Sequence, residues 1–317
     1  MVLKIGLTGA SGMLGRHVLE DLAGRGVLCR ATSRSAPPYL PSIVEWTPFD
    51  LTRIDPAGDV FDRLLGDVKA VIHAAAALPG QGVTDDAIIR VNVQATRALG
   101  DWARRRGTQI VLVSGATVYA EPDRPGLLES DAKVSGPALG GLYGLSKYLA
   151  ELVLKHEESL GLRLTVLRPT SIYGVGLPNS KLVHSMWMKA VAGEDLEIDE
   201  PVDDSFNLVH ASDVALMAIR ASTEGTTGTF NIAGDNVSLM ELAQLCSNLA
   251  NGNRVRVSKG KLGRPAIRRF DLDDRLARSK LGYDRRVNLA SYYRWLMRHG
   301  GHPESIVRVG GAGPGSI

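Results

Sequence analysis

A tyrosine and a lysine four residues apart, Tyr143 and Lys147, have the side chains needed to move a proton. On a helix this spacing puts both residues on one face. A tyrosine hydroxyl has a pKa of ~10, and a nearby ammonium, helped by an oxidised nicotinamide, lowers that pKa by favouring the phenolate. Tyr143 could then exchange a proton with a substrate oxygen while a hydride moves to or from carbon. The same pair could also be an ordinary feature of a helix surface.

Three glycines spaced three apart form a second pattern with a clear chemical use. They follow an apolar run, Val2 to Leu7, that predicts a buried strand, and they precede a predicted helix, Arg16 to Leu22. The unpaired N–H groups and the positive end of a helix attract a pyrophosphate, and glycines let the backbone approach it closely. We therefore predict a dinucleotide site in this turn. Its residues are Gly9, Ser11, Gly12, Met13, Leu14 and Gly15.

The elements that must position these residues alternate along the first half of the chain. Nearly continuous apolar runs predict strands at 2–7, 27–32, 68–76, 109–114 and 163–168, with a further strand ending at 46–51. Helical spacing predicts helices at 16–22, 60–65, 84–106 and 143–160. Strands that alternate with helices indicate an α/β fold, a doubly wound parallel sheet of the Rossmann type. Ligands of such sheets lie across the carboxyl ends of the strands.

Beyond residue 168 the alternation weakens. We expect helices at 182–192, 212–221, 238–251 and 289–298, a strand at 228–232 and a loop at 203–207. Ser212 is a candidate helix cap, and Ser238 with Glu241 forms a capping box. We predict a dinucleotide-binding domain of residues 1–170 plus about 206–235. A smaller, interleaved substrate-binding domain would take about 171–205 plus 236–308, and 309–317 would be a disordered tail.

Composition limits the classes of function. The 317 residues carry a formal net charge of +3, which is too small to indicate nucleic-acid binding. The basic cluster from Arg254 to Arg264 is interpreted as a solvated surface, with binding of an anionic substrate group as the alternative. Cys29 and Cys246 suggest neither a disulfide framework nor a metal site. Because no targeting or membrane-spanning segment is evident, we expect a cytoplasmic protein that binds no membrane.

Taken together, these motifs resemble the short-chain dehydrogenase/reductase superfamily, in particular its extended, epimerase/dehydratase-like branch. The resemblance runs from Lys4 to about Arg298. It is carried by segments 8–15, 50–51, 71–76, 114–119, 143–147, 168–174, 208–215 and 230–234, together with Asn92.

The resemblance implies a role for each of several residues. Tyr143 would be the acid or base, and Lys147 would hold the cofactor ribose. Asp50 and Leu51 would flank the adenine, and Pro169 with Thr170 would contact the nicotinamide. The remaining residues implied to line the cofactor are Ala74, Ala75, Ala76 and Asn92. The resemblance also implies a homodimer that pairs helices 84–106 and 143–160 in a four-helix bundle.

The end of the second strand bears on cofactor choice. Enzymes that prefer NAD usually place a carboxylate there to hold the ribose hydroxyls, but this chain has Ser33 followed by Arg34, with Arg30 nearby. A guanidinium attracts the 2′-phosphate that a carboxylate would repel. We therefore predict NADP(H) as the cofactor in preference to NAD(H).

Three departures from the family pattern concern the reaction. Gly115 stands where the family usually has a serine or threonine that bonds the reacting oxygen. We expect Thr117, or a water, to supply that donor if the backbone stays extended. Ser171 and Phe206 replace an asparagine and an arginine of nucleotide-sugar enzymes, whereas Arg264 matches a later diphosphate-binding arginine.

The sequence thus predicts an NADP(H)-dependent oxidoreductase that interconverts a secondary alcohol and a ketone on a small or sugar-like substrate. Tyr143 would be the acid/base, Lys147 its electrostatic partner, and Thr117 the third catalytic group. Ser171, Phe206 and Arg264 are the candidate substrate-binding residues. The first alternative is a nucleotide-sugar epimerase or dehydratase, and the second is a dinucleotide-binding sensor without catalysis.

Overall fold

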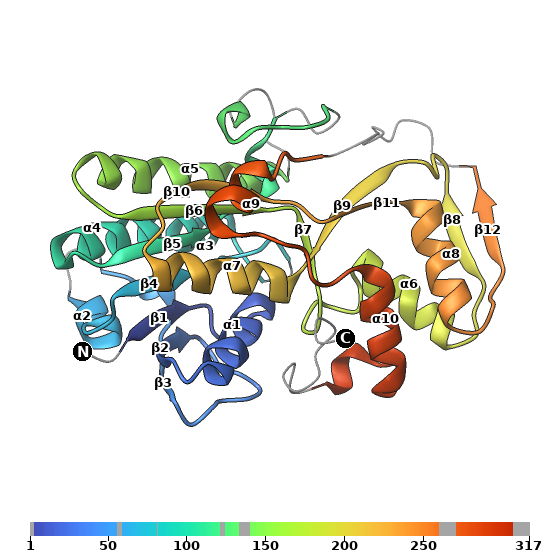
Figure 1. Ribbon diagram of the computed structural model, residues 1–317, viewed down its shortest axis with the longest axis horizontal. Helices are drawn as coiled ribbons and strands as arrows, with labels where there is room; N and C mark the ends of the chain where they lie inside the picture. Colours follow the sequence, from blue (N-terminus) through green and yellow to red (C-terminus); the bar gives the residue numbers. More distant parts are fainter. Residues whose placement is uncertain are drawn as a thin grey trace.

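The computed structural model describes residues 3–55, 59–80, 82–120, 124–132, 140–259 and 271–306 (Figure 1). Its centre is a seven-stranded sheet of order β10-β6-β5-β4-β1-β2-β3, in which every neighbouring pair is parallel. The strands are β1 Lys4–Thr8, β2 Leu28–Ser33, β3 Val44–Pro48, β4 Ala70–His73, β5 Gln109–Val113, β6 Leu164–Pro169 and β10 Gly228–Ile232. The predicted doubly wound α/β class is confirmed.

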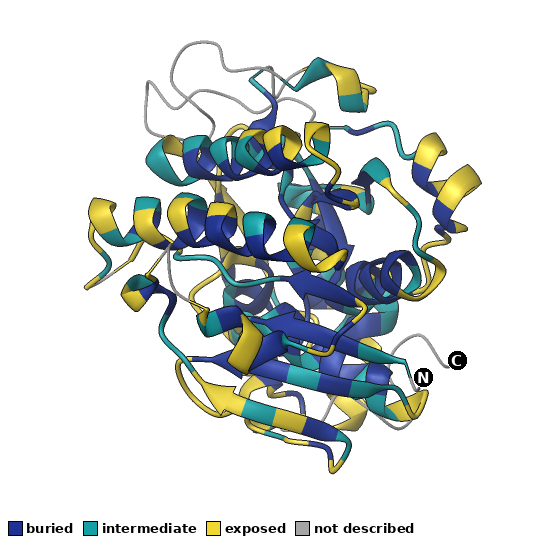
Figure 2. Cartoon of the chain, turned by 90° about the vertical axis from the view of Figure 1, so that its left-hand side faces the viewer, coloured by how far each residue is buried: buried dark blue, intermediate teal, exposed yellow. Residues whose placement is uncertain are grey.

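Helices cover both faces of this sheet because its strands are apolar on both sides. One face packs on α1 (Met13–Gly24) and α7 (Ala211–Glu224). The other packs on α2 (Val60–Leu65), α4 (Thr96–Arg106) and α5 (Gly141–Ser159). Figure 2 shows the inner strands of the sheet buried between these layers, with the exposed residues of the helices facing outward.

A second, smaller set of elements packs around its own apolar cluster at the other end of the molecule (Figure 1). It contains a three-stranded sheet of order β11-β9-β7 and a two-stranded sheet of β12 and β8. These strands are β7 Ser171–Tyr173, β8 Leu196–Asp199, β9 Ser205–His210, β11 Asp235–Ser238 and β12 Val255–Ser258. The helices are α6 Leu182–Val191, α8 Leu239–Leu249 and α10 Leu289–Arg298, while α9 (Arg275–Leu281) lies against β10. The domain bounds stay a prediction.

Two local expectations were wrong. Residues 205–207 begin strand β9, because they pair with residues 236–238 of β11, a partner that the local sequence does not reveal. The cap of α7 is His210, whose ring accepts from the amide of Ser212; Ser212 is not the cap. The expected helix 84–106 is present, with α3 (Asp85–Ile89), a π-helical segment (Arg90–Ala95) and α4 following one another without a break. The capping box of Ser238 and Glu241 is confirmed.

Further findings concern membrane spans, metal sites, the two cysteines and the end of the chain. Among the residues placed by the structure, no helix has the length and apolar character to cross a membrane. In the same residues no group of three or more potential ligand side chains is arranged to hold a metal. Both cysteines are free and buried. The expected tail at 309–317 and residues 260–264 of the basic cluster lie outside the described ranges.

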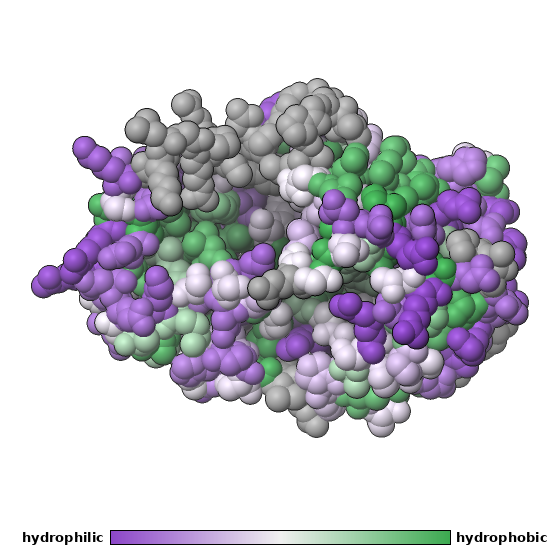
Figure 3. Space-filling model, turned by 180° about the vertical axis from the view of Figure 1, so that it is seen from behind, coloured by the Kyte–Doolittle hydropathy of each residue, from purple (hydrophilic) through white to green (hydrophobic). Residues whose placement is uncertain are grey.

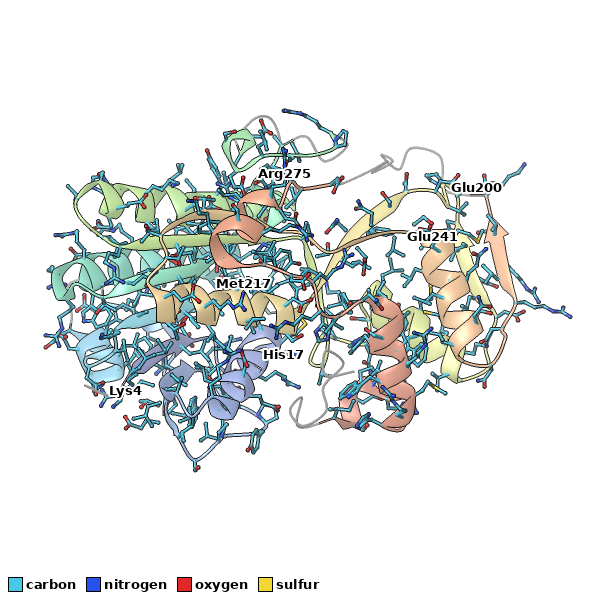
Figure 4. The ribbon with its side chains drawn as sticks, in the orientation of Figure 1. Lys4, His17, Glu200, Met217, Glu241 and Arg275 are labelled. Atoms are coloured by element: carbon cyan, nitrogen blue, oxygen red, sulfur yellow. The ribbon has the colours of Figure 1, made fainter. Side chains whose placement is uncertain are left out.

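His17 makes stability sensitive to acid. It lies on α1, where that helix faces the second set of elements (Figure 4), and its Nε2 is 3.3 Å from the carbonyl oxygen of Val175. Burial lowers the pKa of His17 to about 4 from an ordinary value near 6.5. A pKa that is lower in the folded state gives stability that is present above pH ~6.5 and is lost as the pH falls toward 4.

We expect the free energy of unfolding to decrease by about 3 kcal/mol through His17 alone between pH 7 and pH 4, given ~1.4 kcal/mol per pKa unit. Urea unfolding at several pH values measures the slope of the free energy of unfolding against pH. This slope should be smaller in His17→Gln than in the wild type. His156→Gln, an exposed site on α5, should leave the slope unchanged. Equal slopes for the wild type and His17→Gln would contradict the prediction.

Candidate active site

The glycine turn between β1 and α1 has the geometry of an anion cradle. Gly9 has a φ of +77°, and a Cβ there would stand 2.7 Å from the amide nitrogen of Ala75. A Cβ on Gly15 would collide with the carbonyl oxygen of Gly9. Gly12 is exposed and caps α1 without a side-chain bond, so the first N–H groups of the helix stay available. Gly9 and Gly15 therefore leave no room for a side chain, and this close-packed turn with free helix amides suits a pyrophosphate.

The neighbouring strand ends show where the predicted nucleoside-binding residues lie. The Ser33 hydroxyl donates to the carbonyl oxygen of Ser35 (2.8 Å) and accepts from the Trp46 indole (3.0 Å). Arg34 is exposed. Arg30 instead forms ion pairs with two acidic residues, Glu45 (3.0 Å) and Asp67 (2.9 Å). Of the two arginines expected near this point, Arg34 is therefore the more accessible to a ligand.

Asp50 and Leu51 follow β3. The Asp50 carboxylate accepts from the amide of Thr52 (2.9 Å) and so begins a short 3-10 helix, Leu51–Arg53. Leu51 is buried against the apolar cluster under α2. A local capping bond thus fixes Asp50 at the sheet edge.

Residues 74–76 leave the end of β4 and are half-buried. The next residue, Ala77, is held by the side chain of Asn92. This side chain accepts from the Ala77 amide (2.7 Å) and donates to the Ala77 carbonyl oxygen (3.0 Å). Its amide also donates to the Ser146 hydroxyl (2.9 Å) on α5. Because both amide protons are used, Asn92 acts on this segment as a support. The π-helical segment around Asn92 is where the expected helix is interrupted.

Tyr143 and Lys147 lie one turn apart at the start of α5. The Lys147 ammonium is buried and donates to the carbonyl oxygen of Val113 at the end of β5 (2.7 Å). Burial lowers the pKa of Lys147 to about 8, against the opposing effect of the Glu151 carboxylate. Burial also raises the pKa of Tyr143. The protein by itself therefore raises the pKa of Tyr143, instead of lowering it as expected, because burial disfavours the phenolate.

Thr117 lies beside Tyr143. A Cβ on Gly140 would lie 3.6 Å from the Thr117 Cγ2 and 3.9 Å from the Tyr143 Cδ1. The Thr117 Oγ1 is 3.7 Å from the position of a Cβ on Gly115, and it is buried with no hydrogen-bond partner among the described residues. The expected extended backbone was wrong, since residues 116–118 form a 3-10 turn. The turn nevertheless brings the Thr117 hydroxyl close to the place of the missing serine.

Buried hydroxyl groups without a hydrogen-bond partner among the described residues lie at the carboxyl ends of the strands. Ser114 directly follows β5 and Thr170 directly follows β6, and both, like Thr117, carry a buried Oγ that no group in the described ranges hydrogen-bonds. The Thr170 amide donates to the carbonyl oxygen of Ile232 (3.1 Å), which ties the residue after Pro169 to β10. Buried hydroxyls normally have partners. Three such hydroxyls fit the place of a polar ligand.

The expected substrate-binding residues lie on the second set of elements. Ser171 is exposed at the start of β7, and Phe206 is half-buried in β9, where it packs against the apolar cluster. Arg264 lies outside the described residues. Figure 3 shows a face of the molecule that is hollowed near its middle, with apolar residues on both sides.

The sequence prediction missed a buried ion pair behind Tyr143. The Arg168 guanidinium donates to both carboxylate oxygens of Glu151, at 2.7–3.2 Å, and both side chains are almost fully buried. Glu151 follows Lys147 by one helical turn, and that spacing was the only available signal. The pair fixes the end of β6 against α5 and places a carboxylate near Lys147.

Residues 5–233 match the profile of the NAD dependent epimerase/dehydratase family. The chain belongs to this family. It is an NAD(P)-dependent oxidoreductase or epimerase of the extended short-chain dehydrogenase/reductase type, as the motifs indicated.

Individual members show how wide the family is. The chain is 27% identical over 280 residues to dTDP-4-dehydro-6-deoxy-D-allose reductase from Streptomyces bikiniensis, covering 82% of this chain and 86% of that protein. It is 23% identical over 299 residues to UDP-glucuronic acid decarboxylase 3 from Arabidopsis thaliana, covering 90% and 86%. Among solved structures, UDP-N-acetylglucosamine 4-epimerase from Bacillus cereus superposes with a TM-score of 0.77 at 26% identity, covering 93% and 96%.

Proposed function

We propose that this protein is an NADP(H)-dependent oxidoreductase that interconverts a secondary alcohol and a ketone on a sugar-like substrate. One observation carries the proposal. The Tyr143 ring (Cδ1) and the Thr117 methyl (Cγ2) lie 3.9 Å and 3.6 Å from the position of a Cβ on Gly140, and the buried Thr117 hydroxyl has no hydrogen-bond partner among the described residues. A proton donor next to a second hydroxyl is what a ketone oxygen requires as it becomes an alcohol.

Each residue then has a defined task in reduction. The dinucleotide, when bound, supplies the hydride. Tyr143 donates its proton to the substrate oxygen, and Thr117 donates a hydrogen bond to that oxygen. Lys147, anchored on Val113, keeps two further N–H groups for the cofactor ribose and favours the phenolate left on Tyr143. The high pKa of buried Tyr143 keeps the phenol protonated before the reaction.

The preference for NADP(H) is supported by the end of β2, where exposed Arg34 follows Ser33. A charge-assisted bond to the 2′-phosphate contributes about 1.5–3 kcal/mol, which is roughly a tenfold to hundredfold difference in affinity. We expect NADPH to bind more tightly than NADH by this factor in calorimetric titrations.

Arg34→Leu should remove that preference while leaving the NADH affinity in place. Arg25→Leu, on the exposed end of α1 and paired with Asp21, should alter neither affinity. Tighter binding of NADH than of NADPH by the wild type would overturn the NADP(H) assignment.

A nucleotide-sugar epimerase or dehydratase is the second candidate, favoured by the 26% identity to an enzyme named as a UDP-N-acetylglucosamine 4-epimerase. The two candidates differ in net redox change. With a panel of UDP- and dTDP-4-keto sugars, a reductase consumes one NADPH per product, which absorbance at the reduced nicotinamide band measures. With the corresponding 4-hydroxy sugars and catalytic NADP⁺, epimerisation would invert C4 without net formation of reduced nicotinamide, and that result would replace our first proposal.

Assembly and location belong to the same proposal. A homodimer through α4 and α5 is supported by Leu152, a large apolar side chain on α5 that is 43% exposed. We place the enzyme in the cytoplasm, consistent with two buried, free cysteines.

A further inference from the structure

A buried histidine connects three elements behind the cofactor-binding edge. His73 is the last residue of β4 and is 1% exposed. Its Nδ1 lies 2.7 Å from the hydroxyl oxygen of Thr8, the last residue of β1. Its Nε2 lies 2.9 Å from the hydroxyl oxygen of Thr96, the first residue of α4. The imidazole therefore joins the strand that leads into the glycine turn to a helix on the covering layer.

We assign one tautomer to His73. The Thr8 hydroxyl accepts from the amide of Ala75 (3.3 Å) and keeps its single proton for another acceptor. In the assigned tautomer that proton is given to His73 Nδ1, the unprotonated ring nitrogen. The ring proton lies on Nε2 and is donated to Thr96. Burial, with a further contribution from the Lys147 charge, lowers the pKa of His73 to about 3, so the ring stays neutral.

The hydrogen bond between the Ala75 amide and the Thr8 hydroxyl joins the glycine turn to the segment that follows β4. Thr8 immediately precedes Gly9, and Ala75 belongs to the segment expected to line the cofactor. A Cβ on Gly9 would stand within 3 Å of the Ala74–Ala75 backbone, so the two segments approach each other as closely as they can. A rotation of the Thr8 side chain about χ1 would move its hydroxyl oxygen away from the Ala75 amide and remove this link between the two segments.

We propose that His73 is a positioning residue for the dinucleotide: through the Thr8 hydroxyl it sets the distance between the glycine turn and residues 74–76. The Nδ1 bond to Thr8 carries this role, whereas the Nε2 bond to Thr96 only anchors the ring. The inference rests on the proposed dinucleotide site, which NADPH titration of the wild type tests separately. A wild type without NADPH affinity would end the proposed function; the variants below test His73.

Two substitutions separate the two ring nitrogens. His73→Asn keeps an acceptor oxygen at the position of Nδ1 but cannot reach Thr96. His73→Gln keeps a donor at the position of Nε2 but has no acceptor for Thr8. Thr96→Val removes the anchor alone, and Thr8→Val removes the acceptor of the Ala75 amide directly.

We expect the NADPH dissociation constant to rise about fivefold to tenfold in His73→Gln and Thr8→Val, the effect of one hydrogen bond. It should stay within about twofold of wild type in His73→Asn and Thr96→Val. Thermal melting of all four variants tests a merely structural role, because Thr96→Val should lose stability and keep its affinity. If affinity instead follows melting temperature across the series, or if His73→Gln binds as the wild type does, the proposal is wrong. Should His73→Gln fail to fold, Thr8→Val and His73→Asn are compared instead. Weaker NADPH binding in Thr8→Val alone supports the proposal, and equal NADPH affinities in the two variants overturn it.

Discussion

Replacing Tyr143 by phenylalanine should lower kcat by about 10²- to 10⁴-fold, the usual contribution of a positioned acid or base. The hydroxyl is the only atom group removed, and the ring contacts beside Thr117 and Gly140 remain. NADPH affinity should change little, since the cradle for its phosphates lies at the glycine turn. Steady-state kinetics with NADPH and a ketone substrate measures the loss, and calorimetry measures the affinity.

Tyr148 provides the matched control for this experiment. It stands on the same helix, one residue after Lys147, and packs on a small apolar cluster around Tyr119. Tyr148→Phe should retain the wild-type kcat. A Tyr143→Phe enzyme with more than a tenth of the wild-type kcat would remove Tyr143 from the acid/base role.

Thr117→Ala should cost about 2–4 kcal/mol in the transition state, or roughly 30- to 1,000-fold in kcat, because it deletes the donor to the reacting oxygen. The Thr117 Oγ1 is buried and has no partner in the described part of the protein, so its removal breaks no bond that supports this part of the fold. Folding stability should therefore fall by less than catalysis does.

Thr117→Ser keeps the hydroxyl and should keep most of the activity. Gly115→Ser offers a sharper test in the Thr117→Ala background. The backbone at Gly115 is extended, and a Cβ there meets only the Thr117 Oγ1, at 3.7 Å, among the described atoms. The added serine should restore activity because it returns a hydroxyl to the position usual in the family. Unchanged turnover in Thr117→Ala would exclude Thr117 from the reaction.

Much of the fold could be predicted because periodicity reports burial directly. The continuous apolar runs of β1, β5 and β6 lie in a sheet covered on both faces, and the glycine spacing reflects close backbone contacts that only glycine allows. Tyr143 and Lys147 could be predicted as a pair because both lie on α5. The Val113 contact, which no local pattern indicated, explains how Lys147 is held while buried.

The remaining features depend on partners that are distant in sequence. Strands β7 and β11 have only three and four residues, and β9 begins with the polar Ser205. Strand β9 pairs with both of the others, although long stretches of chain separate the three. Asn92 was expected beside the cofactor, but its amide is used to hold Ala77 and Ser146, which no local pattern reveals. The sign of the Tyr143 pKa shift depends on burial within the folded chain, so spacing alone could not give it.

The central claim is that a dinucleotide rests on the glycine turn with its nicotinamide beside Tyr143. A crystal structure of the protein with NADP⁺ tests it directly. We expect the pyrophosphate against the first amides of α1 near Gly12, and the nicotinamide ring in contact with Thr170 and the Tyr143 phenol. A dinucleotide bound elsewhere, or a nicotinamide out of reach of Tyr143, would contradict this claim.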